Sequence, residues 1–167
     1  MGNGSWMGTF VKLHHYHAEI WLPRPLDDVF AFFSNAENLG VLTPPWVAFE
    51  ILTKLPIGMR AGTRIDYRIR IHGFPLRWQT EITQWEPGRR FVDEQRRGPY
   101  RSWIHEHQFE AVEDGTRMID DVHYAARGGE WLHRVFIRKD IEKIFDFRRQ
   151  KMVELFPAAR SAIEMVG

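Results

Sequence analysis

"TRIDYRIRIHGFPLRWQTEITQWE", residues 63–86, alternates apolar and polar side chains with a period of two. In its first half the apolar positions are Ile65, Tyr67, Ile69 and Ile71. Alternation of this kind predicts a β-strand over 63–73 with one buried face and one face toward water. A second strand is expected over 76–86. The stretch therefore indicates antiparallel strands that follow one another through short turns.

Further strands are expected on both sides of this stretch. On the C-terminal side one strand covers 90–97, after a turn at Pro87-Gly88, and two more lie within 98–124. On the N-terminal side a short strand covers 47–53, and the first strand of the chain covers 14–22. The sequence shows no alternation of strands with helices of the kind that builds parallel sheets, so an antiparallel sheet is predicted.

Two segments have a helical period instead. Residues 24–42 predict a helix whose acidic first turn suits the helix dipole, followed by a second short helix that Asn35 would cap. Residues 130–156 carry an apolar stripe and predict a helix of about 40 Å that ends at Pro157. A break in this long helix is expected near 137–140.

These elements predict an α+β fold. A curved antiparallel sheet of about seven strands must cover its apolar face, and only the C-terminal helix is long enough to do so. We expect the sheet to wrap around that helix, with the two short helices after the first strand closing one end. Residues 11–157 would form the single domain, with a disordered leader over 1–10 and a flexible tail over 158–167.

Composition narrows the classes of partner. The formal net charge of the 167 residues is +1, so no overall field recruits nucleic acid or a membrane surface. Cysteine is absent, which excludes disulfides and thiolate chemistry and fits a cytoplasmic protein. No apolar run reaches the ~18 residues of a membrane span. The aromatic content of 14% indicates either a bulky core or a large lined cavity.

The arrangement resembles the helix-grip fold of the START-related superfamily called SRPBCC, which includes pollen allergens, lipid-transfer domains and polyketide cyclases. "WLPRPLDDVFAFFSNAENLGVLTPPWVAFEI" (21–51) is similar to the first strand and helices of the family. "RFVDEQRRGPYRSWIHEHQF" (90–109), "TRMIDDVHY" (116–124) and "IFDFRRQ" (144–150) are similar to signatures of one bacterial branch. Members of that branch are often labelled cyclase/dehydrase-like or cell-division-inhibitor-like. The resemblance spans roughly 15–156 and implies a START-like domain whose inner sheet face lines a cavity.

The phase of the alternation assigns residues to that inner face. If Ile65 and Tyr67 point inward, the spacing also places Trp103, His105 and His107 inward. The polar residues expected on this wall are Asp93, Gln95, His105, His107, Asp120 and Tyr124. This set is too polar for a dry core, because each such group needs a hydrogen-bond partner or water.

Four interpretations of the inner wall stay open at this point. His105 and His107 could bind a metal ion with Asp93 or Asp120, although spacing alone is weak evidence and no metal is expected. The same four residues could act as acid–base groups in an aldol cyclisation, as in cyclases of the superfamily. They could form a buried polar network that needs no substrate. Finally, they could orient a ligand in an otherwise apolar cavity.

We favour the ligand-binding cavity, with a small hydrophobic or aromatic molecule as the partner. No cofactor is expected, since the chain lacks a G-x-G-x-x-G fingerprint. A protein-interaction module is the remaining alternative, in keeping with the cell-division label. The expected ligand-binding residues are Tyr67, Ile69, Trp78, Gln95, Trp103, His105, His107, Phe109, Tyr124, Phe145 and Arg148. Ile65, Ile141 and Met152 are expected to complete the apolar lining.

Three further features have simpler interpretations. Trp46, after Thr43-Pro44-Pro45, is expected to pack near the mouth of the cavity. The histidines at 14, 15 and 17 look like a metal cluster, but alternation divides them between two faces of the first strand. Arg148 could bind a ligand carboxylate through two hydrogen bonds, yet a surface arginine that extends its charged end into water is the more conservative interpretation.

Overall fold

The computed structural model describes residues 12–157 and 159–164. Its strands are β1 (His14–Leu22), β2 (Glu50–Ile51), β3 (Arg64–Ile71), β4 (Phe74–Glu86), β5 (Arg90–Arg97), β6 (Ser102–Val112), β7 (Gly115–Ala125) and β8 (Arg160–Glu164). Its helical elements are α1 (Leu26–Phe33), η1 (Ala36–Gly40), η2 (Pro45–Val47), α2 (Gly129–Leu132), η3 (His133–Ile137) and α3 (Arg138–Leu155).

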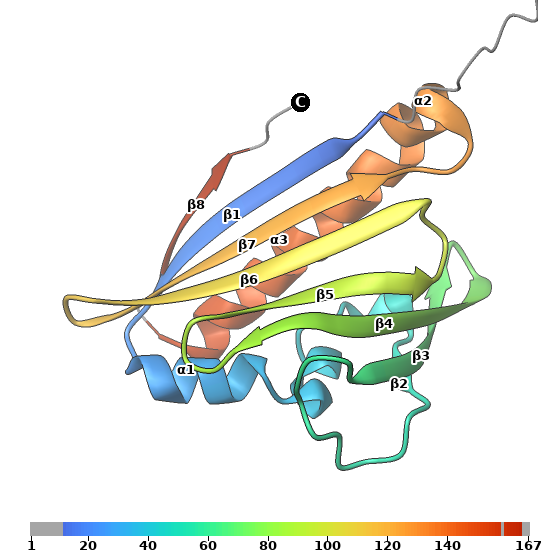
Figure 1. The fold of residues 1–167 in the computed structure, drawn as a ribbon. Helices are drawn as coiled ribbons and strands as arrows, with labels where there is room; N and C mark the ends of the chain where they lie inside the picture. The colour runs from blue at the N-terminus through green and yellow to red at the C-terminus, as the bar shows by residue number, and fades with distance from the viewer. Residues whose placement is uncertain (1–11, 158, 165–167) are drawn as a thin grey trace, which may run out of the picture.

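The strands form one antiparallel sheet in the order β2-β3-β4-β5-β6-β7-β1-β8. The sheet curves around α3, and α1 lies beneath one end of the strands (Figure 1). Two register irregularities in the pairing of β4 with β5 fall between Gln79 and Gln84, and bulges of this kind bend a strand. The predicted helix-grip fold, a curved sheet around a long C-terminal helix, is confirmed.

The alternation in β3 has the predicted phase. Ile65, Tyr67 and Ile69 are buried, whereas the charged residues between them are exposed. The turn to β4 passes through His72 and Gly73, both with positive φ. A glycine adopts this backbone region at little cost, which explains why the chain reverses here.

The first helices match the sequence signals. α1 begins after Pro25, carries two acidic residues in its first turn and buries Val29 and Phe30. Asn35 caps η1 as predicted, because its side-chain oxygen accepts a hydrogen bond of 3.0 Å from the backbone N–H of Glu37. These helices therefore close one end of the sheet with an apolar surface.

The C-terminal helix is irregular slightly earlier than expected. η3, at 133–137, has π-helical hydrogen bonding, and α3 then runs regularly through the predicted break near 137–140 as far as Leu155. The side of α3 that faces the sheet buries Ile141, Phe145, Arg148 and Met152. A single regular helix thus covers the inner face of the sheet.

The ends of the chain are described only in part. The expected leader over 1–10 lies outside the described residues. Within the expected flexible tail, residues 160–164 form β8 and pair with β1, while 158 and 165–167 lie outside the described residues. β8 is a short segment whose five residues display no clear period, so the sequence pattern does not reveal it.

The buried apolar residues form two clusters along the length of the sheet. One surrounds the middle of β3 and β4 and includes Tyr67, Trp78 and Phe145. The other lies toward α1 and includes Phe30 and Met152. The same helix, α3, contributes to both clusters.

Gly115 provides a test of how tightly the β6–β7 turn packs against β1. A Cβ added at Gly115 would lie 2.3 Å from the backbone oxygen of Leu22 and 3.0 Å from Nε1 of Trp21. Overpacking of this kind costs about 1–3 kcal/mol, so Gly115→Ala should lower the free energy of unfolding by that amount in urea titrations. The control is Gly58→Ala, where an added Cβ meets nothing within 4 Å. Equal urea midpoints for the two variants would contradict the described packing.

Candidate functional site

A layer of charged and polar side chains crosses the molecule between the two apolar clusters. It comprises Asp93 on β5, His105 and His107 on β6, Asp120 on β7 and Arg148 on α3. On β6, Trp103 packs against one apolar cluster and Phe109 belongs to the other. The two histidines therefore occupy the boundary between the clusters. We call these five residues the polar layer.

Strand register brings the carboxylates and imidazoles together. Asp93 lies directly opposite His105 across β5 and β6, and His107 lies opposite Asp120 across β6 and β7. The hydrogen bonds run diagonally: Nε2 of His105 donates to Oδ1 of Asp120 at 2.9 Å, and Nε2 of His107 donates to Oδ2 of Asp93 at 3.1 Å. The two imidazole rings lie 3.8 Å apart.

Arg148 is buried, so the expectation of a surface arginine is wrong. Its Nη2 lies 3.4 Å and its Nε 3.3 Å from the two carboxylate oxygens of Asp120. Its guanidinium also lies 5.6 Å from the ring of Phe33 and 6.0 Å from that of Phe145. The apolar stripe of α3 carries Arg148 inward, and the carboxylate of Asp120 on β7 provides the partner that makes burial of its charge tolerable.

The carboxyl groups of the polar layer are held in their charged form. Burial alone would raise the pKa of Asp120, but the Arg148 charge and the hydrogen bonds from His105 and His107 outweigh it and hold that pKa well below its usual range. Burial would also raise the pKa of Asp93, and the hydrogen bond from His107 with the nearby imidazole charges lowers it instead. A further hydrogen bond, from Thr80 Oγ1, reaches Oδ1 of Asp93 at 3.1 Å.

The two histidines differ in charge. Burial and the neighbouring charge of His107 lower the pKa of His105. Burial also acts to lower the pKa of His107, but its contacts with Asp120 and Asp93 outweigh burial and raise that pKa. At pH 6.5 His107 is therefore mainly protonated and His105 mainly neutral, so that the layer then holds two carboxylates against one imidazolium and one guanidinium. The charges balance within the layer.

Two atoms of the layer, Nδ1 of His107 and Nε of Arg148, lack an aligned hydrogen-bond partner among the described residues. Nδ1 of His107 lies 2.8 Å from Oδ1 of Asp120, but the geometry does not form a hydrogen bond, and the atom is buried without another partner among the described residues. A charged imidazole needs an acceptor for both N–H groups. For Nδ1 of His107, the attraction between the imidazolium and the nearby carboxylate of Asp120 takes the place of an aligned hydrogen bond.

A cavity of about 200 Å³ lies beside the layer, between the sheet, α3 and the first helices. The predicted site residues that line it are Asp93, Tyr67, Ile69, Trp78, Trp103, His105, His107, Phe145 and Arg148. The indole N–H of Trp78 is buried without a hydrogen-bond partner among the described residues. The wall therefore combines a mainly apolar surface, the unsatisfied indole N–H of Trp78 and one charged layer.

The other predicted site residues do not line the cavity. Gln95 exchanges hydrogen bonds with the backbone of Tyr100, at 2.9 and 3.2 Å, and so fixes the turn between β5 and β6. The hydroxyl of Tyr124 lies 2.9 Å from Nε2 of His133. Phe109 packs in the apolar cluster near α1, and Asp120 lies behind the two histidines. Met152, expected in the lining, belongs to the same cluster near α1.

Part of the cavity wall comes from segments that show no period of two. These lining residues are Phe32, Phe33, Ala36, Leu39, Leu42, Val47, Phe49 and Met59. They lie on the first helices and in the irregular segment before β3, where alternation gives no phase. Trp46, expected near the cavity mouth, is 58% exposed and packs edge-on against Phe147, and its neighbour Val47 lines the cavity instead.

The spacing of Asp93, His105 and His107 would also allow a metal ion, because their donor atoms lie within 4.8 Å of one another. Arg148 and the raised pKa of His107 argue against a cation at this position, since both place positive charge in the same layer. The residues satisfy one another through ion pairs. Their arrangement suits proton transfer or orientation of a ligand better than metal binding.

The comparisons with known proteins agree with this architecture. Residues 22–153 match the sequence profile of the family described as polyketide cyclase/dehydrase and lipid transport. A comparison with curated protein sequences finds no match. Among the described residues, no helix has the length and apolar character to cross a membrane.

Solved structures with the same fold come from bacteria and a plant. Protein CV1439 from Chromobacterium violaceum superposes with a TM-score of 0.68 at 12% identity, covering 86% of this chain and 96% of its own. Protein Ms6760 from Mycobacterium smegmatis gives 0.63 at 14% identity, covering 86% and 91%. Major latex-like protein 151 from Panax ginseng gives 0.60 at 10% identity, covering 87% and 98%. At these identities the likeness shows the fold alone.

The charge difference between the two histidines can be measured. Both have an ordinary pKa of 6.5, raised for His107 and lowered for His105. Histidine side-chain NMR across a pH titration should find, at pH 6.5, His107 mainly protonated and His105 mainly neutral. The raised pKa means that His107 stabilises the fold below pH 6.5, and this contribution is lost as the pH rises through the pKa of His107 in the folded state. The lowered pKa of His105 has the opposite effect, because protonation of His105 destabilises the fold as the pH falls below 6.5. Equal midpoints, or the reverse order, would contradict the described layer.

Proposed function

Because this chain belongs to the polyketide cyclase/dehydrase and lipid-transport family, we propose that it binds a small aromatic or otherwise largely apolar molecule in the central cavity. The observation that carries this proposal is the wall of the cavity. Apolar side chains from the sheet, α3 and the first helices form most of it, and polar groups gather on one side. Ligand sites commonly combine an apolar lining with a few convergent polar groups.

The volume of the cavity favours a compact ligand. Sites for drug-sized molecules span roughly 300–1,000 Å³, whereas a dry apolar cavity of about 150 Å³ holds benzene. At about 200 Å³ this cavity suits a molecule with one or two rings better than a lipid with long chains. The aromatic rings of Tyr67, Trp78 and Trp103 would pack against such rings.

The polar side of the cavity favours a neutral polar group on the ligand. Asp93 is already paired with His107 and Asp120 with Arg148, so a ligand carboxylate would add an unpaired charge to a buried layer. The free indole N–H of Trp78 calls for an acceptor. A ketone or phenol oxygen meets both conditions. We therefore propose a small phenol or aromatic ketone as the ligand class.

Acid–base catalysis is the second candidate function, and the pairing of one neutral with one charged histidine favours it. Neutral His105 can accept a proton from a carbon next to a carbonyl group, while the positive charges of His107 and Arg148 can stabilise the developing oxyanion. Both histidines line the cavity. Tyr124 and Gln95, expected to polarise the carbonyl, lie elsewhere, so His107 or Arg148 takes that role in this proposal.

Two further expectations stay predictions. A cytoplasmic location is supported by the absence of cysteine. A protein-interaction role predicts an exposed apolar patch outside the cavity. Trp131 and Phe136, 70% and 45% exposed with ring centroids 6.3 Å apart, supply two such residues beside the start of the long helix.

Filling the cavity tests the binding proposal. Ile144 lines the cavity from α3, whereas Val153 lies on the same helix, 42% exposed and outside the cavity lining. We expect 2-naphthol to bind the unaltered chain with one equivalent in isothermal titration calorimetry, and palmitate not to bind. Ile144→Trp should weaken 2-naphthol binding at least tenfold, about 1.4 kcal/mol, because the larger side chain occupies the ligand volume. The matched control Val153→Trp should bind normally. Equal losses in both variants would refute binding in this cavity.

Proton exchange separates catalysis from simple binding. 2-Tetralone is a bicyclic ketone with exchangeable hydrogens next to its carbonyl group. If His105 acts as a base, NMR should show faster uptake of deuterium at that carbon with the unaltered chain than with His105→Gln, while both bind the ketone. A chain that binds 2-tetralone without accelerating exchange would refute the catalytic candidate and leave binding intact. Tyr67→Leu should instead weaken binding, since it removes part of the wall.

A further inference from the structure

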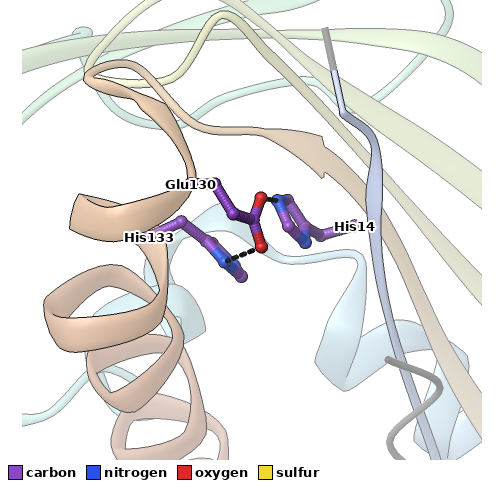
Figure 2. A group of neighbouring side chains, drawn as sticks. All are labelled: His14, Glu130 and His133. Carbon is purple, nitrogen blue, oxygen red and sulfur yellow. Dashed lines mark ion pairs between the residues drawn. The ribbon is translucent and has the colours of Figure 1, made fainter.

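A second histidine cluster lies away from the cavity, where β1 begins beside the start of the C-terminal helix. It consists of His14 on β1, Glu130 on α2 and His133 on η3, and none of the three lines the cavity (Figure 2). Sequence alternation separates His14 from His15 and His17 and gives it no partner. The fold provides the partners from a segment more than a hundred residues further along the chain.

The donor atoms of this cluster converge on one point. Nε2 of His14 lies 3.6 Å from Oε2 of Glu130, and Nδ1 of His133 lies 4.0 Å from Oε1. All three donor atoms lie within 4.8 Å of one another. A tetrahedral zinc ion with bonds of about 2.0–2.1 Å holds its ligand atoms roughly 3.3–3.4 Å apart. Small side-chain movements would therefore bring these atoms to the spacing of ligands around one ion.

His133 is arranged as a metal ligand would be. Its Nε2 lies 2.9 Å from the hydroxyl of Tyr124, which can accept a hydrogen bond and so fix the proton on that nitrogen. Nδ1 is then a lone-pair donor, and it is buried with no hydrogen-bond partner among the residues that the structure describes. His133 itself is only 5% exposed. Metal-bound histidines typically hold their second nitrogen in this way, and an unpaired buried nitrogen is costly otherwise.

The two imidazole rings of the cluster pack directly against each other. They stack with centroids 3.4 Å apart and planes 17° apart. Both rings lie beside the same carboxylate, that of Glu130.

From this geometry we propose that His14, Glu130 and His133 form a binding site for a divalent cation of the zinc class. Two histidines and one carboxylate are a known ligand set for Zn²⁺ and leave a fourth position open to water. Glu130 is 39% exposed on its side chain, so the open position lies on the solvent side. A bound ion would fasten the first strand to the start of the C-terminal helix.

Lys12 is the main competitor for the site. Its Nζ lies 3.1 Å from Oε1 of Glu130. The lysine side chain is 62% exposed, and an exposed ion pair of this kind contributes little energy. The ion would displace Lys12 from the carboxylate, and Lys12→Gln should therefore bind the ion at least as tightly as the unaltered chain.

Zinc titration of the full chain tests the site. After removal of metals by chelation, isothermal titration calorimetry should show one equivalent of Zn²⁺ that Mg²⁺ does not replace, because histidine ligands disfavour Mg²⁺. Glu130→Gln, a change at a partly exposed position, should weaken that equivalent at least tenfold. Tyr124→Phe should weaken it by about tenfold to a hundredfold through the orientation of His133. NMR of the unaltered chain should show Nδ1 of His133 changing its shift when Zn²⁺ is added.

The matched control is a second group of donors on the outer face of the sheet, formed by His15, His17 and Asp121. His17→Gln should retain the zinc equivalent. Loss of zinc in His17→Gln with retention in Glu130→Gln would overturn the proposal and assign the metal to the outer face. Retention of zinc in both variants, or the absence of any zinc equivalent, would also overturn it.

Discussion

The buried carboxylate of Asp120 is the constraint on which the rest of the structure depends. It has no direct access to water and is held by His105, His107 and Arg148, which come from β6 and α3. Loss of one partner from such a group typically costs about 3–5 kcal/mol. A slip of one residue between β6 and β7 would turn both histidines to the outer face. The polar layer thus fixes the register of the sheet and the rotation of α3 together.

Sequence reasoning predicts the fold and the inner face of the sheet because both depend on local periods. Alternation over 63–71 is sufficient to show which side of β3 is buried. The same rule places His105 and His107 inward on β6, where the structure has them. The apolar stripe from Ile141 to Met152 likewise predicts the covering helix. In these elements the side chain that faces inward is decided by its neighbours two, three or four residues away.

Periodicity in the sequence does not predict which side chains of the site pair with one another. Arg148 is inside because Asp120 lies across from it on β7, and no local pattern records that pairing. Gln95 has the inward phase but bonds to the turn at Tyr100, since a backbone nearby offers both donor and acceptor. Tyr124 likewise turns to His133. The irregular wall before β3 has no phase to extrapolate. Contacts between distant segments decide each of these positions.

The π-helical turn of η3 has a consequence for how this chain could have changed length. His133 stands eight residues before Ile141, yet both are buried, while Arg134, seven before, is exposed. In a regular helix seven residues make almost two full turns, so position 134 would share the side of Ile141. The π-helical turn contains one more residue than a regular turn, so His133 and not Arg134 lies on the same side as Ile141. η3 therefore has the geometry of a single-residue insertion that evolution could add or remove without rotating either flanking face.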